Sequence, residues 1–444
     1  MQKKVSLFFR LSKKAIGGIR LKTELRKGQE AVLGLQHLLA MYAGAVAVPL
    51  LIGTGLNFNA EQMTYLISID IFMCGVATLL QLVVTKYFGI GLPVVLGCAI
   101  QTVAPLIMIG NSKGIGAIYG SIIASGIIVV LISGVFSKIK KLFPPIVTGT
   151  IITVIGLTLI PVAMEKMGGG SSSSPDFGSS KSLLLAFITI ACIVVIQVWG
   201  RGFLKSISVL VGLLVGTILA GLMGGIDVSP VGTAPLFHLP QPFYFGKPTF
   251  DLSSIVLMVI ISIVSMVEST GVYFALGDIV GKKVGEEELK KGYRAEGLAA
   301  ILGGVFNTFP YTGFSQNVGL VQLSGIKNRR PIFYSAFFLI ILGLFPKVGA
   351  LAQIIPEPVL GGGMLVMFGM VAIQGIKMLT QVEFNNEKNL VIMAISIGFG
   401  LGFNSMPQLF QSLPEMVQLF TSNGIVMSSV TAVVLNLAIN GLEK

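Results

Sequence analysis

A single carboxyl side chain, that of Glu268, lies in the middle of a long apolar stretch, SIVSMVESTGVYFALGD. It follows Asp251 by seventeen residues and precedes Asp278 by ten, so a helix over this stretch places it near the centre of a bilayer. A carboxyl group there costs several kcal/mol unless it is paired or protonated, which makes it a functional candidate by default. It can accept an N–H from a ligand or take up a proton. A buried structural pair is the alternative interpretation.

An amide pair, Gln316 and Asn317, interrupts a second apolar stretch, GFSQNVGLVQLSG at 313–325. Amides offer both donors and acceptors, and the neighbouring glycines allow the backbone to leave a regular helix. Together with Glu268, such a set suits a flat, neutral ligand with several hydrogen-bonding edges better than a bare ion. The alternative is that the two amides only join neighbouring helices.

Four further polar side chains lie elsewhere in the chain. Glu296, in YRAEGLAAILGG, is either a second protonation site or the partner of Arg294 or another basic neighbour. His37, in LGLQHLLAMYAG, is predicted to be a packed neutral imidazole, with proton shuttling as the alternative. For Asp70 we expect a hydrogen bond between helices, and for His238, which lies in a loop, no functional role.

The cysteines and glycines carry no recognisable chemistry. Cys74, Cys98 and Cys192 lie in apolar runs without paired spacing, which predicts small buried side chains and neither a disulfide nor a metal site. The sequence also lacks a Gly-rich phosphate loop, a Cys/His cluster and a nucleophile elbow. We therefore expect no catalytic residues and no enzymatic activity.

The elements that must position these groups are membrane helices. The chain of 444 residues is 53% hydrophobic and 11% charged, whereas a typical soluble domain is about 25% charged. Spans of roughly 17–25 apolar residues, several of them short or broken, predict fourteen segments near 30–52, 63–84, 91–110, 115–137, 144–163, 182–199, 203–224, 251–279, 294–306, 312–326, 331–345, 358–380, 388–402 and 422–440. We expect an all-α polytopic membrane protein in the plasma membrane.

The distribution of Lys and Arg predicts the orientation. With the N-terminus inside, 26 of the 31 basic residues fall in the first 28 residues, the inner loops and the C-terminus. The five that remain outside are Lys113, Lys166, Lys181, Lys247 and Lys347. Cytoplasmic loops collect Lys and Arg, so both termini are predicted to be cytoplasmic. The net charge of +12 then reflects topology and contact with the lipid bilayer, and no nucleic-acid partner is expected.

An internal repeat relates the two halves of the chain. FPPIVTG at 143–149 resembles PEPVLGG at 356–362, with Pro145 and Pro358 213 residues apart. GCAIQTVAP and TGFSQNVGL align at an offset of 215, which pairs Gln101 with Gln316. Seven predicted spans separate the copies, and an odd number inverts the second copy. Interrupted segments at corresponding positions of inverted repeats, here the third and tenth, predict a binding site halfway across the membrane.

Several motifs together resemble one transporter family. They are LGLQHLLAMYAG, LFPPIVTGTIITVIGLTLIP, SMVESTGVYFALGD, RAEGLAAILGGVFNTFP, SQNVGLVQLSG and PEPVLGGGMLVMFG. They are similar to the nucleobase-ascorbate transporters, also called nucleobase:cation symporters of the second type, and most of all to bacterial xanthine and uric acid permeases. The resemblance covers about residues 30–440. The family signature is matched by Gln316, Asn317, Gly319 and Ser324.

The resemblance implies fourteen segments in two inverted repeats of seven, divided into a core domain and a gate domain. It also implies uptake driven by the proton gradient without a cofactor, an elevator-like movement of the core, and commonly a homodimer. The expected boundaries are a cytoplasmic tail at 1–28, core segments at 29–138 and 251–346, an extracellular loop at 226–250, and gate segments at 139–225 and 347–444.

The resemblance also implies roles for individual residues. Glu268 matches the glutamate that hydrogen-bonds the base, and Gln316 the side chain that binds purines. The other expected substrate-binding residues are Ser315, Asn317, Gln101 and Thr102. Glu268, Glu296 and His37 are the expected proton-coupling residues.

This sequence departs from the family pattern at positions that bear on proton coupling and on the substrate. Val272 stands where uracil members tend to have His and several xanthine members Asp, so proton handling is expected to rest more on Glu268 and Glu296. Gln101 is larger than expected, which leaves the choice between xanthine and uric acid open. We therefore expect a proton-coupled purine nucleobase permease, with xanthine first and uric acid as the alternative. More distant alternatives are a uracil or other nucleobase permease, an inorganic-anion transporter of the same inverted-repeat plan, and a channel or intramembrane enzyme.

Overall fold

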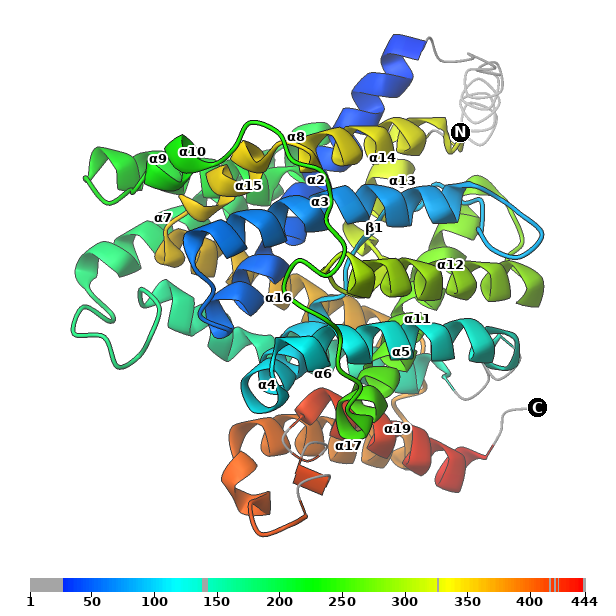
Figure 1. The fold of residues 1–444 in the computed structure, drawn as a ribbon. Coiled ribbons are helices and arrows are strands. Elements are labelled where there is room, and N and C mark those ends of the chain that lie inside the picture. The colour runs from blue at the N-terminus through cyan, green and yellow to red at the C-terminus, as the bar shows by residue number, and fades with distance from the viewer. Residues whose placement is uncertain are drawn as a thin grey trace, which may run out of the picture.

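The computed structural model describes residues 27–137, 143–325, 327–414, 417–418, 421 and 423–441. The predicted tail at 1–28 and the first predicted core–gate boundary, near 138–139, fall almost entirely outside these residues. The longer helices are α2 (Lys27–Gly55), α3 (Ala60–Leu82), α5 (Ile115–Phe136), α6 (Pro145–Met167), α7 (Ser180–Trp199), α9 (Ser208–Leu222), α11 (Leu252–Val280), α12 (Glu286–Val305), α16 (Glu357–Leu379), α17 (Glu387–Ser405) and α19 (Gly424–Asn440). Figure 1 shows them stacked side by side.

Shorter elements fill the interrupted segments and the connections. They are strand β1 (Leu96–Cys98), a 3-10 turn (Ile100–Thr102), α4 (Val103–Lys113), α8 (Phe203–Ser206), α10 (Ser229–Thr233), strand β2 (Tyr311–Gly313), α13 (Ser315–Ser324), α14 (Arg330–Gly343), α15 (Pro346–Gln353) and a second 3-10 turn (Pro407–Phe410). The sequence did not predict α15, which is bent by 83° from α14 at a break before Pro346. Proline at the first turn of a helix is favourable, so Pro346 starts a new helix.

The chain is a multi-pass membrane protein. Seven of the described helices are long and apolar enough to cross a membrane by themselves, or eight spans if α14 and α15 are counted as one. Each of the fourteen predicted stretches contains a described helix or a strand followed by a short helix. The count of fourteen spans stays a prediction, because the remaining helices are short, broken or less apolar.

The third and tenth predicted segments are interrupted and meet. β1 and β2 form an antiparallel pair with Leu96 opposite Gly313 and Cys98 opposite Tyr311. The hydrogen bonds continue past the strands, since Phe314 N donates to Val95 O at 2.9 Å and Ala99 N to Pro310 O at 2.9 Å. These bonds satisfy backbone groups that lipid could not, which is the condition for extended chain at membrane depth.

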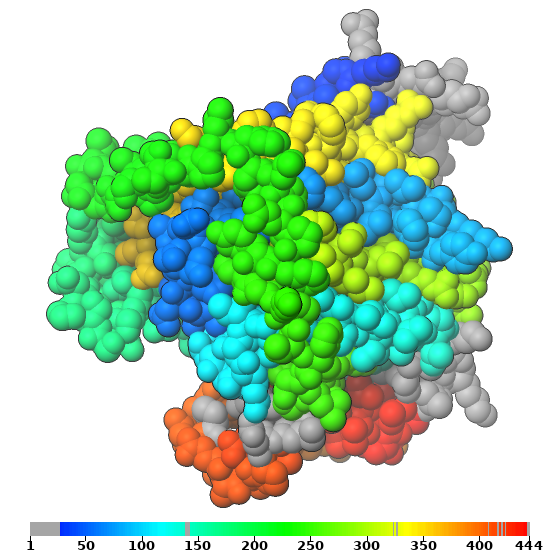
Figure 2. Space-filling model, in the orientation of Figure 1, coloured from blue at the N-terminus to red at the C-terminus, as the bar shows by residue number. Residues whose placement is uncertain are grey.

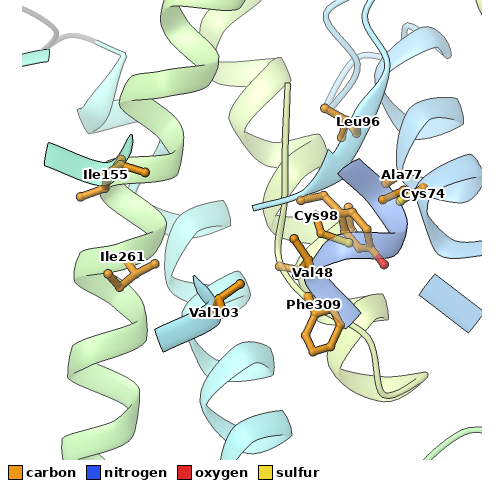
Figure 3. Packing of buried hydrophobic residues seen from close by; sticks show 14 of the residues in the cluster. Val48, Cys74, Ala77, Leu96, Cys98, Val103, Ile155, Ile261 and Phe309 are labelled. Atoms are coloured by element: carbon orange, nitrogen blue, oxygen red, sulfur yellow. The ribbon is translucent and has the colours of Figure 1, made fainter. Parts of the chain in front are cut away.

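Side chains of the flanking helices hold the two strands. Thr78 of α3 accepts from Leu96 N at 3.0 Å, and Ser269 of α11 accepts from Gly313 N at 3.0 Å. Figure 3 shows the apolar packing around β1, with Cys98 close to Cys74 and Ala77 of α3. The crossing of the two segments is therefore fixed by buried packing on both sides.

Contacts that join a helix of one half of the chain to a helix of the other half recur between the equivalent helices. α3 packs on α14, and α12 packs on α5. If segments seven apart are equivalent, α3 corresponds to α12 and α14 corresponds to α5, so each pair is the repeat of the other. α6 packs along its own counterpart α16, where a Cβ at Gly375 would meet the backbone of Thr153. An internal two-fold axis would produce this pattern, which supports the predicted inverted repeat.

A connecting segment, residues 234–250, lies across the ends of several helices and is called the strap below. Figures 1 and 2 show it in green, passing over α3 and α5. Its backbone is tied down at three places, because His238 N donates to Leu344 O, Phe243 N to Val305 O and Thr249 N to Gly116 O, at 2.8 to 3.1 Å. The strap therefore covers the end of the molecule at which α3, α5 and α11 begin.

Candidate functional site

A cavity of about 590 Å³ lies between α11 and α13 on one side and α6 and α16 on the other. The first wall includes Glu268, Ser315 and Val318, and the second includes Thr148, Gln374 and Met378. Ligand pockets commonly measure 300–1,000 Å³ and combine apolar walls with a few polar groups, as this one does. The cavity extends to Asp278 and Lys377, near the C-terminal ends of α11 and α16.

Glu268 is held from the crossing strands. Gln101, in the turn after β1, donates its amide N–H groups to Glu268 Oε2 at 3.1 Å and to Ser265 Oγ at 2.7 Å. Gln101 is 1% exposed, and its Oε1 has no hydrogen-bond partner among the described residues. The structure thus brings the predicted Gln101 and Glu268 into direct contact and leaves a buried acceptor beside the carboxyl group.

The N-terminus of α13 adds donors to the cavity. Helix α13 begins at Ser315, which lines the cavity, and the first N–H groups of a helix have no partner within it. Gln316 follows at the next position, but its side chain is exposed and is not among the residues that line the cavity. Ser315 Oγ donates to Gln316 Oε1 at 3.3 Å. Gln316 therefore reaches a ligand in this cavity only after a side-chain rotation.

Asn317 points away from the cavity, toward α2. Its Nδ2 lies 3.2 Å from His37 Nδ1 and donates to His37 O at 3.1 Å, and both residues are buried. The predicted coupling residue His37 and the predicted binding residue Asn317 are thus partners of one another, and this contact joins α13 to α2.

Thr102 and Ser324 make local bonds. The Thr102 hydroxyl donates to Ala99 O at 2.6 Å within the turn before α4, and Ser324 donates to Val321 O at 3.1 Å within α13. Gly319 has open space around its Cα. In this conformation these three residues shape the backbone around the cavity and do not line it.

Glu296 lies in a second buried polar group behind α11. It is 4% exposed and accepts a hydrogen bond from the Tyr273 hydroxyl, which in turn accepts from Gln81 Nε2 at 2.6 Å. The suggested partner Arg294 donates instead to Ser133 Oγ at 3.2 Å. Of the two predicted readings of Glu296, the ion pair with Arg294 is therefore absent from this structure.

Asp70 bonds to the strands, so the prediction of a helix–helix hydrogen bond is wrong. Asp70 Oδ2 accepts from Cys98 Sγ at 2.6 Å and Oδ1 from the Tyr311 hydroxyl at 3.2 Å. Cys98 and Tyr311 are opposite one another in the β1–β2 pair, so one carboxyl group holds both strands. Ligand atoms of Asp70, Cys74 and Cys98 lie within 4.8 Å of one another, a cluster that the sequence spacing did not reveal.

No role was assigned from the sequence to the second wall of the cavity. Thr148 and Gln374 are polar residues inside apolar helices, on α6 and α16, and both line the cavity opposite Glu268. Thr148 lies within the FPPIVTG motif at 143–149, and Gln374 lies further along the helix that begins in the matching PEPVLGG motif at 356–362; this was the available signal. Which side of α6 faces α11 is a tertiary property that spacing alone does not fix.

Comparison with known proteins identifies the family of this chain. A family model described as Permease family matches residues 28–409. The chain belongs to this permease family. The match confirms the resemblance to nucleobase-ascorbate transporters that the sequence motifs indicated, and the chain is a permease and not an enzyme.

Proteins named as permeases or transporters match this chain over nearly their whole length. The xanthine permease of Bacillus subtilis (strain 168) is 54% identical and is matched over 94% of this chain and 95% of that protein. The uric acid permease PucK of the same strain is 53% identical over 92% of this chain and 95% of that protein. The uric acid transporter UacT of Escherichia coli (strain K12) is 40% identical over 94% and 88%.

Solved structures share the fold at much lower identity. The transmembrane domain of the cyanobacterial bicarbonate transporter BicA superposes with a TM-score of 0.65 at 16% identity, covering 89% of this chain and 97% of that chain. The structure of SLC26A9 gives a TM-score of 0.61 at 13% identity, with 94% and 66% covered. The permease therefore has the helical architecture of these membrane transporters.

Proposed function

We propose that this permease carries a purine nucleobase, xanthine first and uric acid second, across the plasma membrane. The observation that carries the proposal is the cavity in which Glu268, held by Gln101, faces the N-terminus of α13. Relatives named as xanthine and uric acid permeases at 53–54% identity support the substrate class. Both bases present ring N–H groups and carbonyl oxygens around a flat ring.

The arrangement of donors and acceptors fits such a ring. Glu268 Oε atoms accept N–H groups, while the N–H groups at Ser315 donate to a carbonyl oxygen. Phenylalanine rings at 136, 143 and 274 line the same cavity and give flat apolar surface for the ring faces. Gln316 reaches the base by turning inward, and Asn317 holds the start of α13 in place through His37.

Transport follows from the position of the cavity between two groups of helices. Glu268, Gln101 and Ser315 belong to the proposed core, at 29–138 and 251–346, and Thr148 and Gln374 to the proposed gate, at 139–225 and 347–444. Movement of the core past the gate carries the base to the other side. With the proposed inward orientation of both termini, the ends of α11 and α16 near Asp278 and Lys377 face the cytoplasm.

The proposed driving force is the proton gradient, with Glu268 and Glu296 as the groups that exchange a proton and His37 as an additional site. No cofactor is required in this scheme. A homodimer in the lipid bilayer is the proposed assembly. The coupling is tested by uptake into energised vesicles. Uptake that is unaffected when the pH gradient is collapsed, and that follows the sodium gradient, contradicts it.

The substrate is tested by uptake of radiolabelled xanthine with uracil, xanthine, urate, hypoxanthine and guanine as competitors. Xanthine and urate are expected to compete best. Glu268→Gln and Gln316→Ala should weaken uptake by roughly one to two decades, because each leaves a buried partner unsatisfied at about 1–3 kcal/mol. Unchanged purine uptake in both variants rules out the assignment.

A further inference from the structure

A second cavity, of about 470 Å³, lies beneath the strap, at the start of α3. Its walls come from α3, α10, α15 and the strap, and include Tyr65, Tyr244 and His238. The strap leads into the N-terminus of α11, whereas the Glu268 cavity extends to the C-terminus of the same helix. Helix α11 has 29 residues and is therefore roughly 43 Å long, so the two cavities open at opposite ends of the permease.

The walls of this second cavity suit a flat ring. The rings of Tyr65 and Tyr244 are stacked at 3.7 Å between centroids, and the His238 ring lies 5.3 Å from that of Tyr65. Proline rings at 230, 235 and 346 form other parts of the lining. Aromatic surfaces stack favourably on heterocyclic bases, at about 1–3 kcal/mol per base.

One polar atom in the lining lacks a partner. His238 Nδ1 lies 3.0 Å from Leu239 O, and a carbonyl oxygen can only accept, so Nδ1 carries the proton. Nε2 of the neutral ring is then an acceptor, and this atom is buried without a hydrogen-bond partner among the described residues. A buried acceptor left unpaired is costly, and a ligand N–H is the group that satisfies it.

The acceptors and the stacked rings together define the ligand. Glu61 lines the same cavity, and Tyr65 is fixed because its hydroxyl donates to Gln241 O at 2.9 Å. The cavity thus offers oxygen and nitrogen acceptors beside flat aromatic surface, with no Lys or Arg in its lining. A planar, neutral heterocycle with ring N–H groups matches this lining, and an inorganic anion does not.

From these observations we infer that the cavity under the strap is a second binding site, which captures the transported purine on the face opposite the opening of the Glu268 cavity. The inference rests on the proposed function for the identity of the ligand. It gives His238 the role of hydrogen-bond acceptor for a ring N–H, and Tyr65 and Tyr244 the role of a stacking wall. The site raises the local concentration of substrate before the core accepts it.

The test compares binding and uptake of radiolabelled xanthine by the full-length permease. His238→Leu removes the acceptor, and His238→Gln restores an amide acceptor. The matched control is Leu236→Ala, an exposed residue of the same strap that does not line the cavity. His238→Leu is expected to raise the half-saturating external xanthine concentration about fivefold to tenfold, the effect of one lost hydrogen bond. The maximal rate of uptake should stay unchanged, and His238→Gln should restore most of the loss.

Equilibrium binding to the purified permease in lipid nanodiscs provides the second readout. Glu268→Gln is expected to retain a weak binding component that His238→Leu removes in the double variant. Tyr244→Leu, which takes away part of the stacking wall, should act like His238→Leu and serves if the latter fails to fold.

Opposite results separate the two proposals. If Glu268→Gln abolishes all binding, or if the His238 and Tyr244 variants alter only the maximal rate or nothing, the second site does not exist, while the proposed transport stands. If the wild-type permease neither binds nor transports a purine, the proposed function itself fails.

Discussion

The contact between Gln101 and Glu268 gives the sharpest prediction, because the sequence predicted both as site residues and the structure shows a hydrogen bond between them. Gln101→Ala removes the amide that donates to Glu268 at 3.1 Å and to Ser265 at 2.7 Å. Gln101 is 1% exposed, so the space it leaves is enclosed by protein and not by bulk water. Glu268 then faces the cavity without the group that fixes its orientation.

The size of the effect follows from the lost hydrogen bonds. A hydrogen bond to a charged or buried partner contributes about 1.5–3 kcal/mol, and every 1.4 kcal/mol is tenfold in affinity. We therefore expect Gln101→Ala to weaken half-saturation for xanthine by about 10- to 100-fold. The lower end of this range applies if water in the cavity replaces the amide beside Glu268.

The assay is uptake of radiolabelled xanthine by cells that express equal amounts of each variant, arranged as a double-mutant cycle. If Gln101 acts through Glu268, the double variant with Glu268→Gln should be no worse than Glu268→Gln alone, since one interaction cannot be lost twice. Gln411→Ala, an exposed amide far from the cavity in sequence, is the matched control. Fully additive losses in the double variant would refute the reasoning.

Three further predictions concern the elements that support the site. Asn317→Ala should lower thermal stability and uptake by an amount that is not additive with His37→Ala, because the two side chains bond to each other; additive melting shifts would contradict this. Asp70→Leu should destabilise the purified protein by about 1–3 kcal/mol and Asp70→Asn by less, as measured by thermal denaturation in detergent, since only the amide keeps polar atoms facing Cys98 and Tyr311; equal effects would argue against the clamp. Gly375→Ala should cost about 1–3 kcal/mol through overpacking against α6, whereas Gly369→Ala, on the same helix with open space, should be nearly neutral; a shift of the same size in both would show that helix propensity, and not packing, is responsible.

The interruptions of the third and tenth segments were predictable because the local sequence determines them. Glycine and proline flank both breaks, and a polar amide pair follows the second, so the repeat offset of 215 pointed to two matching broken segments. The structure confirms that both contain a strand and that the strands pair. Glu268 was equally predictable from the local sequence, because a carboxyl group in a long apolar run is costly and is therefore a functional candidate.

The side-chain partners were not predictable, because they depend on how helices rotate against one another. Asn317 was expected at the ligand and instead bonds to His37, 280 residues away. Asp70 was expected between two helices and instead holds two strands that arrive from sequence positions 98 and 311. Spacing in the sequence shows where a residue lies along a helix. It does not show which neighbour the residue faces when the helix is buried on all sides, because such a helix has no polar face.

The chemistry of the ligand can be separated from the fold, because solved structures at 13–16% identity include a bicarbonate transporter. The N-terminus of a helix favours an anion, and α13 begins in the cavity at Ser315. Glu268 lies in the same cavity as the start of α13, so its carboxyl group offsets that positive potential and leaves donors and acceptors for a neutral ring. An excess of bicarbonate is therefore expected to leave xanthine uptake unchanged at constant pH, whereas uric acid should compete. Inhibition by bicarbonate that Glu268→Gln strengthens would show that the dipoles, and not the carboxyl group, select the ligand.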